Sequence, residues 1–211
     1  MVVVLTPSFT DDITRPGQSY VSFLRSPYAH ARIVSIDTAA AAAMPGVLVV
    51  LTGADLVAAG VQPLAGPAGF KRADGTPVAS PPRRALAHER VRFVGETVAA
   101  VVAESLQQAR DAAEAIDAQF EELPVAVDVA AAMAAGAPTL CDAAPDNIAA
   151  EMRHGDAAAA EQAFAQAAHV VQLATSHQRL MAVTLEPRAC LAWVADDGRL
   201  TLHISSQMPS G

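Results

Sequence analysis

The feature that most constrains the fold of this 211-residue chain is a continuous apolar run at 97–103, followed at once by a helical repeat. Apolar residues after the run recur at intervals of three and four, which places them on one face of an α-helix. They are Leu106, Ala109, Ala113 and Ile116. A short segment around Phe120, ending at Glu121-Glu122-Leu123-Pro124, follows as an edge-like strand. A strand, a helix and a strand joined by short connections predict an α+β or α/β layered domain.

Three more strands and two short helices are expected before this unit. Each strand is an apolar stretch bounded by turn residues, and the run at 47–51 has the continuous apolar pattern of a buried strand. Asp37-Thr38 offers a cap to the first helix. The expected strands cover 18–24, 32–36 and 47–51, and the expected helices cover 39–43 and 52–56.

Residues 60–84 are rich in Gly and Pro and have little periodicity, which predicts a long surface loop. The loop carries a basic cluster, Lys71-Arg72 with Arg83-Arg84. A solvated loop is the preferred interpretation, and contact with an acidic partner is the alternative. Gly95-Glu96 is interpreted as a turn before the strand at 97–103.

A second unit is expected after an alanine-rich linker. It starts with a helix capped by Gly155-Asp156 and continues with strands at 169–174 and 189–194. Asp196-Asp197-Gly198 turns the chain into a last strand at 200–205. In that strand one face is apolar, because Leu200, Leu202 and Ile204 alternate with Thr201 and His203. A hairpin and one helix do not close a core, so we expect this second unit to be incomplete.

Composition excludes several functions. The net charge is −8 and no Lys/Arg block occurs, which argues against binding to nucleic acid or to an anionic membrane. Aromatic residues make up 4% of the chain, too few for a base-stacking platform. Alanine accounts for 48 residues, so the larger aliphatic side chains must form the core. No targeting or membrane-spanning segment is visible.

No self-contained catalytic or metal site is predicted. The six histidines lack metal-ligand spacing, and His30 is interpreted as a hydrogen-bonded core or interface residue. Cys141 and Cys190 are far apart and are read as ordinary reduced thiols. Glu121-Glu122 is interpreted as a solvated strand end rather than an acid/base pair. We therefore name no catalytic residue and no metal ligand.

Several short phrases carry more information in order than separately. They are Arg25-Ser26-Pro27-Tyr28-Ala29-His30-Ala31-Arg32-Ile33, Ile36-Asp37-Thr38 with Met44-Pro45-Gly46-Val47, Leu51-Thr52-Gly53-Ala54-Asp55-Leu56, Val94-Gly95-Glu96 with 98–103, Glu122-Leu123-Pro124, Asn147, Gly155-Asp156, Leu185-Glu186-Pro187-Arg188 and Ser205-Ser206-Gln207. In this order they resemble the N-terminal part of the large subunit of molybdenum hydroxylases. This is the family of xanthine dehydrogenase, aldehyde oxidase and aerobic carbon monoxide dehydrogenase.

The resemblance implies an α+β fold in two parts. Residues 8–130 would form an α/β-hammerhead domain, 131–150 a linker, and 151–211 the opening strands and helix of a molybdopterin-binding domain. The family's glycine-rich loop and its general-base glutamate find no match here. We therefore expect a shortened large subunit, or one piece of a split one, that is inactive alone.

The resemblance also assigns site residues. Gln207 matches the family's cofactor-contacting glutamine, and a neutral amide can donate a hydrogen bond to an oxo group without adding charge. Glu186 and Arg188 match a phrase near the cofactor and the substrate funnel. An ion pair between them that fixes two strands is the preferred interpretation of these two residues.

The implied function is a contribution of scaffold and one cofactor contact to oxidative hydroxylation of a small substrate. Candidate substrates are an aldehyde, a purine, an N-heterocycle and carbon monoxide. The implied cofactor is the molybdenum cofactor, with iron–sulfur clusters and FAD on partner subunits, and the remainder of the large subunit is a further partner. We expect a cytoplasmic location, with export on a partner left open. The alternative is a non-catalytic assembly or binding module that keeps the hammerhead fold.

Overall fold

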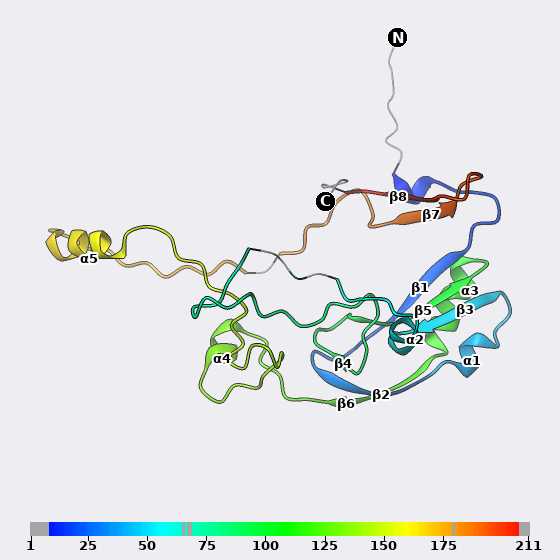
Figure 1. Ribbon diagram of the computed structural model, residues 1–211, viewed down its shortest axis with the longest axis horizontal. Helices are drawn as coiled ribbons and strands as arrows, with labels where there is room; N and C mark the ends of the chain where they lie inside the picture. Colours follow the sequence, from blue (N-terminus) through cyan, green and yellow to red (C-terminus); the bar gives the residue numbers. More distant parts are fainter. Residues whose placement is uncertain (1–8, 65, 67–68, 179, 207–211) are drawn as a thin grey trace, which may run out of the picture. The chain divides into compact units, whose positions relative to one another are not determined.

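The computed structural model describes residues 9–64, 66, 69–178 and 180–206 (Figure 1). Its contacts divide the chain into two compact units. The packed unit is Ser19–Asp156. The hairpin unit combines Met1–Gln18 with Ala157–Gly211.

The packed unit contains a three-stranded antiparallel sheet in the order β1-β5-β3 (Figure 1). Its strands are β1 (Tyr20–Arg25), β3 (Val47–Thr52) and β5 (Thr97–Ala103). The run predicted at 97–103 is the central strand, and it is mostly buried because it has a partner on each side. Val101 of this strand is fully buried in the main apolar cluster. The strongest signal in the sequence therefore marks the centre of this sheet.

Helix α3 (Leu106–Glu114) packs against β1 and β5. Ser105 begins the helix by accepting a hydrogen bond from the Gln108 amide. The predicted helical face is confirmed at three of its four residues, because Ala109, Ala113 and Ile116 are buried. Leu106, the first residue of the helix, is 39% exposed. Small side chains therefore form the buried face and allow the helix to approach the sheet closely.

A second antiparallel sheet has the order β4-β2-β6. Its strands are β2 (Ala31–Asp37), β4 (Arg90–Val91) and β6 (Asp117–Glu122). The last of these lies at an edge, as predicted. His30, just before β2, is 4% exposed, and its Nδ1 lies 2.8 Å from the Pro124 carbonyl oxygen. His30 is thus a hydrogen-bonded core residue, also as predicted.

Three short helices complete the packed unit. They are α1 (Ala39–Ala42), α2 (Gly53–Ala58) and α4 (Val129–Met133). At the start of α2, the Asp55 carboxylate accepts hydrogen bonds from the Thr52 hydroxyl at 2.6 Å and the Thr52 amide at 2.7 Å. The bond from the Thr52 hydroxyl, and to a smaller extent the bond from its amide, lowers the pKa of Asp55. The predicted starts of α1 and α2 are both confirmed.

The long loop at 60–84 is attached to a distant segment of the same unit. The Arg72 guanidinium bonds the Asp146 carboxylate at 2.8 Å and the Ile148 carbonyl oxygen. Backbone bonds join Ala79 to Ala149 at 2.9 Å and Glu151 to Lys71 at 2.8 Å. Arg72 of the basic cluster therefore has its acidic partner within this chain.

The hairpin unit contains β7 (Cys190–Val194) paired with β8 (Leu200–Ile204), a 3-10 turn η1 (Thr10–Asp12) and helix α5 (Ala157–Gln166). Gly198 makes the turn between the strands with a φ of 81°. One face of the hairpin is covered by the N-terminal segment. The Arg15 guanidinium lies 4.3 Å from the Trp193 ring centroid, and Thr10 Oγ1 lies 3.4 Å from His203 Nδ1. The predicted alternation is confirmed, since the opposite face carries Leu200, Leu202 and Ile204.

Two predictions are wrong. The run at 47–51 forms a strand, but it lies at the edge of its sheet, and Leu48 is 58% and Val49 41% exposed. The segment 169–174 forms no strand, because no other described segment offers it a hydrogen-bonding partner. Val171 in that segment is 91% exposed. An apolar stretch by itself thus predicts neither burial nor strand pairing.

Among the described helices, none has the length and hydropathy needed to cross a bilayer.

Candidate functional site

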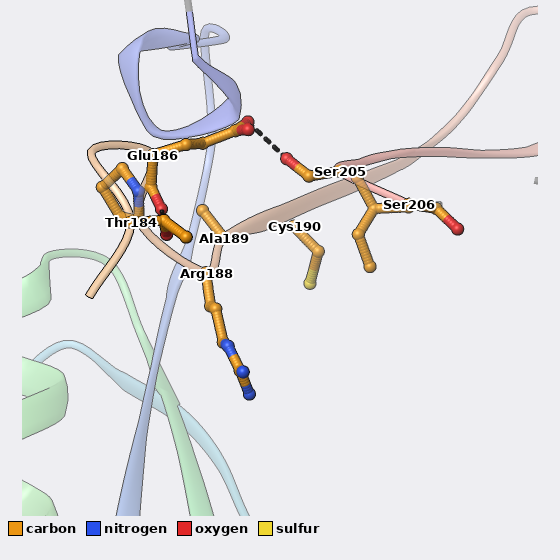
Figure 2. A pocket seen from close by; sticks show the side chains of 9 residues that line it. Thr184, Glu186, Arg188, Ala189, Cys190, Ser205 and Ser206 are labelled. Atoms are coloured by element: carbon orange, nitrogen blue, oxygen red, sulfur yellow. Dashed lines mark hydrogen bonds between the residues drawn. The ribbon is translucent and has the colours of Figure 1, made fainter. Parts of the chain in front are cut away.

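The open end of the β7–β8 hairpin forms a cavity of about 670 Å³ (Figure 2). It lies where β7 begins and β8 ends, so residues distant in the sequence meet there. The lining residues are Thr184, Glu186, Pro187, Arg188, Ala189, Cys190, Ile204, Ser205 and Ser206. Glu186 and Arg188, which were singled out from the sequence, both line this cavity.

Glu186 connects the segment before β7 to the residue after β8. The Ser205 hydroxyl donates a hydrogen bond to Glu186 Oε1, drawn as a dashed line in Figure 2. The Thr184 hydroxyl donates to the Glu186 backbone carbonyl at 2.7 Å. The Glu186 carboxylate is therefore an acceptor that closes the end of the hairpin.

Arg188 extends away from Glu186 in Figure 2. The described residues contain no ion pair between these two side chains, and Arg188 is exposed. Its guanidinium presents five N–H donors, which suit a carboxylate or phosphate. Arg188 is thus the positively charged donor group of the cavity.

The cavity combines hydrogen-bond donors with an apolar side. Arg188 and the hydroxyls can bind an anionic, oxygen-rich group, while Ile204 and Pro187 provide apolar contact surface. Molybdopterin is such a group, so the side chains present fit it by their chemistry. Cys190 contributes an exposed free thiol.

Gln207, the predicted cofactor contact, lies outside the described residues and directly follows Ser206 of the cavity wall. Among the described residues no group of three or more His, Cys, Asp or Glu side chains could hold a metal ion. Thr184 and Ser205 were not predicted as site residues on their own. Ser205 could have been identified from the Ser205-Ser206-Gln207 phrase, whereas nothing in the sequence points to Thr184.

Two family models match the chain. Residues 6–124 match the model described as "Aldehyde oxidase and xanthine dehydrogenase, a/b hammerhead domain". Residues 140–211 match the model described as "Molybdopterin cofactor-binding domain", and this range includes the whole cavity.

Relatives and solved structures agree with these matches. The chain is 39% identical over 206 residues to the nicotine 6-hydroxylase large subunit of Paenarthrobacter nicotinovorans, covering 95% of this chain and 24% of that protein. It is 35% identical over 215 residues to the carbon monoxide dehydrogenase large chain of Afipia carboxidovorans, covering 96% and 25%. The structure of quinoline 2-oxidoreductase from Pseudomonas putida 86 superposes with a TM-score of 0.74 at 35% identity, covering 96% and 25%. The chain spans about a quarter of the length of these relatives.

Proposed function

This chain belongs to the aldehyde oxidase and xanthine dehydrogenase family, and we propose that it acts as the part of a molybdopterin-binding large subunit that frames the cofactor site. The observation that carries the proposal is the cavity at the end of the hairpin. It places the Arg188 guanidinium and the Ser205 hydroxyl within the residues that match the cofactor-binding domain. The chain would contribute scaffold and contacts, and the remaining three quarters of such a subunit would supply the rest of the site.

The side chains would have distinct roles. Gln207 would donate its amide hydrogen to an oxygen of the bound cofactor, as the family phrase implies. Arg188 would bind an anionic part of the cofactor or of the substrate. Glu186, held by Ser205, would keep the two strand ends together so that the residues after β8 are correctly positioned. When bound, the cofactor would supply the two-electron redox chemistry of oxidative hydroxylation.

The proposed domain organisation uses the residue ranges that the family resemblance implies. Residues 8–130 would be the hammerhead domain, 131–150 a linker and 151–211 the start of the cofactor-binding domain. The partners would be the remainder of the large subunit and iron–sulfur and flavin subunits. The substrate would be a small molecule such as an aldehyde, a purine, an N-heterocycle or carbon monoxide, and the enzyme would work in the cytoplasm.

Loading of the cofactor tests this proposal. The complete large subunit that carries this sequence is produced with its partner subunits, as wild type and with Arg188→Gln or Gln207→Ala. We expect each variant to lower molybdenum content or turnover by about tenfold, because one hydrogen bond to a charged group is lost. Molybdenum is measured by mass spectrometry and turnover by reduction of an electron acceptor.

Arg199→Gln provides the matched control, because Arg199 lies in the same hairpin, carries the same charge and does not line the cavity. It should leave both readouts unchanged. The proposal fails if the 211-residue chain alone binds one molybdenum per chain. It also fails if the complete assembly forms without molybdenum, which would favour the non-catalytic assembly module.

A further inference from the structure

A second cavity, of about 270 Å³, lies within the packed unit beside β4, and we call it the arginine cavity. It does not include any residue of the cofactor-site cavity. Three guanidinium groups and one imidazole line it together with two carboxylates and an apolar wall. The lining residues are Val57, Pro82, Arg84, Ala87, His88, Glu89, Arg90, Arg92 and Glu96.

The three arginines have few acceptors among the described residues. Arg84 donates to the Val61 carbonyl oxygen at 3.3 Å, and Arg92 Nε donates to the Leu140 carbonyl oxygen at 3.4 Å. Arg90 Nη1 lies 3.8 Å from a carboxylate oxygen of Asp142. These are long contacts, and each guanidinium has five N–H donors to satisfy.

The two carboxylates of the cavity wall contact groups other than the three guanidiniums. Glu96 Oε2 accepts a hydrogen bond from the Arg92 backbone amide at 2.6 Å. The Glu89 side chain is 81% exposed and lies 3.5 Å from His88 Nε2. Neither forms an ion pair with Arg84, Arg90 or Arg92 among the described contacts.

Other arginines of the same unit are paired directly. Arg32 forms an ion pair with Glu121 across neighbouring strands, and Arg72 forms one with Asp146 at 2.8 Å. Arginines that join separate segments of this unit are therefore paired with carboxylates. Of the three arginines that line the cavity, by contrast, Arg84 and Arg92 have no ion pair among the described residues, and Arg90 has only the long contact with Asp142 at 3.8 Å.

The backbone around the cavity is held in place before any ligand arrives. Glu89 has a φ of 67°, a left-handed conformation that is unusual for a residue with a side chain. Its carbonyl oxygen accepts from the Ile33 amide at 2.8 Å, and the Ala87 amide donates to the Thr97 carbonyl oxygen at 2.7 Å. The backbone that carries Arg90 and Arg92 is thus fixed in place, which reduces the backbone entropy lost when a ligand binds.

We propose that the arginine cavity binds an oxyanion, either a phosphate or a carboxylate, through Arg84, Arg90 and Arg92. An adjoining cavity of about 420 Å³ shares Arg90 and Arg92, so the site has room for a group larger than one carboxylate. Its wall also carries Asp142 and Arg32, and Arg32 is already paired with Glu121. Planar guanidinium groups bind phosphates and carboxylates through paired hydrogen bonds. This proposal does not depend on the function proposed above. Two sources fit the same chemistry, a free anion and an acidic side chain of another polypeptide.

Titration of the isotope-labelled 211-residue chain, followed by NMR of the arginine Nε–Hε groups, tests the proposal. One arm uses inorganic phosphate and the other a capped diglutamate peptide, both at constant ionic strength. We expect saturating shifts of Arg84, Arg90 and Arg92 in at least one arm. Tighter binding of phosphate indicates a free anion, and tighter binding of the peptide indicates an acidic polypeptide.

Variants make the assignment specific. Arg84→Gln and Arg90→Gln should each weaken binding by roughly fivefold, whereas Arg90→Lys should retain part of it. Arg83→Gln is the matched control, because Arg83 is adjacent in sequence, exposed and absent from the cavity wall. The far-ultraviolet circular dichroism of each variant verifies folding. Shifts that follow ionic strength without saturating, or equal weakening by Arg83→Gln, would overturn the proposal.

Discussion

The packed unit and the hairpin unit use similar β-patterns and reach different degrees of burial. In the packed unit, Val98 and Val101 of β5 are fully buried because a strand lies on each side and both faces are covered. Val101 packs in the cluster that includes Ala112 and Ala113 of α3, and Val98 packs in a second cluster with Ala31 and Val91. In the hairpin unit, Leu200 of the predicted apolar face is 74% exposed, and its cross-strand partner Val194 is 68% exposed. Alternation decides which face is apolar, whereas burial requires a further element to cover that face.

The two longest described helices, α3 and α5, show the same contrast. Helix α3 buries Ala109, Ala112 and Ala113 against the first sheet. Helix α5 has no buried residue, and its Phe164 is 64% exposed. Alanine favours a helix in both segments, but only α3 has a sheet to pack against among the described residues.

A carboxylate introduced into one strand of each unit should give the largest difference in stability between the two units. Val101→Asp should lower the free energy of unfolding of the packed unit by about 4 kcal/mol or more, because it buries a carboxylate without a partner. Val194→Asp, the matched change in β7, should alter stability by about 0.5 kcal/mol or less, because the side chain is exposed. Urea denaturation measures both effects, together with amide exchange of β5 for Val101→Asp and of β7 for Val194→Asp. Equal losses for the two variants would remove the distinction between the units.

Asn147 should give an intermediate, local effect in the packed unit. Its side chain accepts from the Leu140 amide at 3.1 Å and donates to the carbonyl oxygens of Ala132 and Pro138 at 2.9 and 3.0 Å. Its φ of 58° is also one that asparagine tolerates better than alanine. Asn147→Ala should therefore cost about 2 kcal/mol, seen as faster amide exchange over 132–148.

Asn147→Asp is the control for that experiment. It keeps the acceptor for the Leu140 amide and the tolerance for a positive φ, and it loses the two donated bonds. We expect a loss of protection at least as large as for alanine, because a carboxylate oxygen would face the carbonyl oxygens of Ala132 and Pro138 in place of the donor. An unchanged exchange rate in Asn147→Ala would show that this side chain does not hold the segment.

The smallest expected effect is a pH dependence of the contact between the long loop and 146–151. The hydrogen bond from Arg72, followed by one from the Ile148 amide, lowers the pKa of the Asp146 carboxyl. Because the pKa of Asp146 is lower in the folded chain than in the unfolded chain, ionisation of this carboxyl stabilises the contact above about pH 4. This stabilisation is lost as the pH falls through the pKa of the folded chain. Amide exchange of Ala79 and Glu151 between pH 3 and 6 measures it, since both amides join the two segments.

The same measurement on Asp146→Asn and Arg72→Gln separates the contribution of the Arg72–Asp146 ion pair from that of other carboxyls. Each variant, and the double variant, should lose the additional protection above pH 4. A pH profile in Asp146→Asn identical to that of the wild type would assign the effect to other carboxyls.

Most elements of the packed unit were predictable from the sequence because their signals are local. The run at 97–103 and the repeat at 106–116 depend on side-chain spacing along the backbone, and the Thr52–Asp55 capping box spans only four residues. The family and its fold were recognisable because several short phrases occur in the expected order. The edge position of β3 and the missing strand at 169–174 were not predictable, because both depend on which segments are available for pairing.

The candidate site divides in the same way. The phrase around Glu186 and Arg188 was visible in the sequence, but the bond from Ser205 to Glu186 joins residues 19 positions apart and requires the hairpin to form. Arg72 was recognised as part of a basic cluster, while its partner Asp146 lies 74 positions away.

The sequence by itself determined where backbone periodicity and capping favour helices and strands, since steric and hydrogen-bonding preferences act between near neighbours. Only the tertiary structure decided which apolar faces are covered, which charges are paired, and which arginines are left around a cavity with few acceptors. Those outcomes depend on contacts between distant segments, whose energies no local pattern specifies.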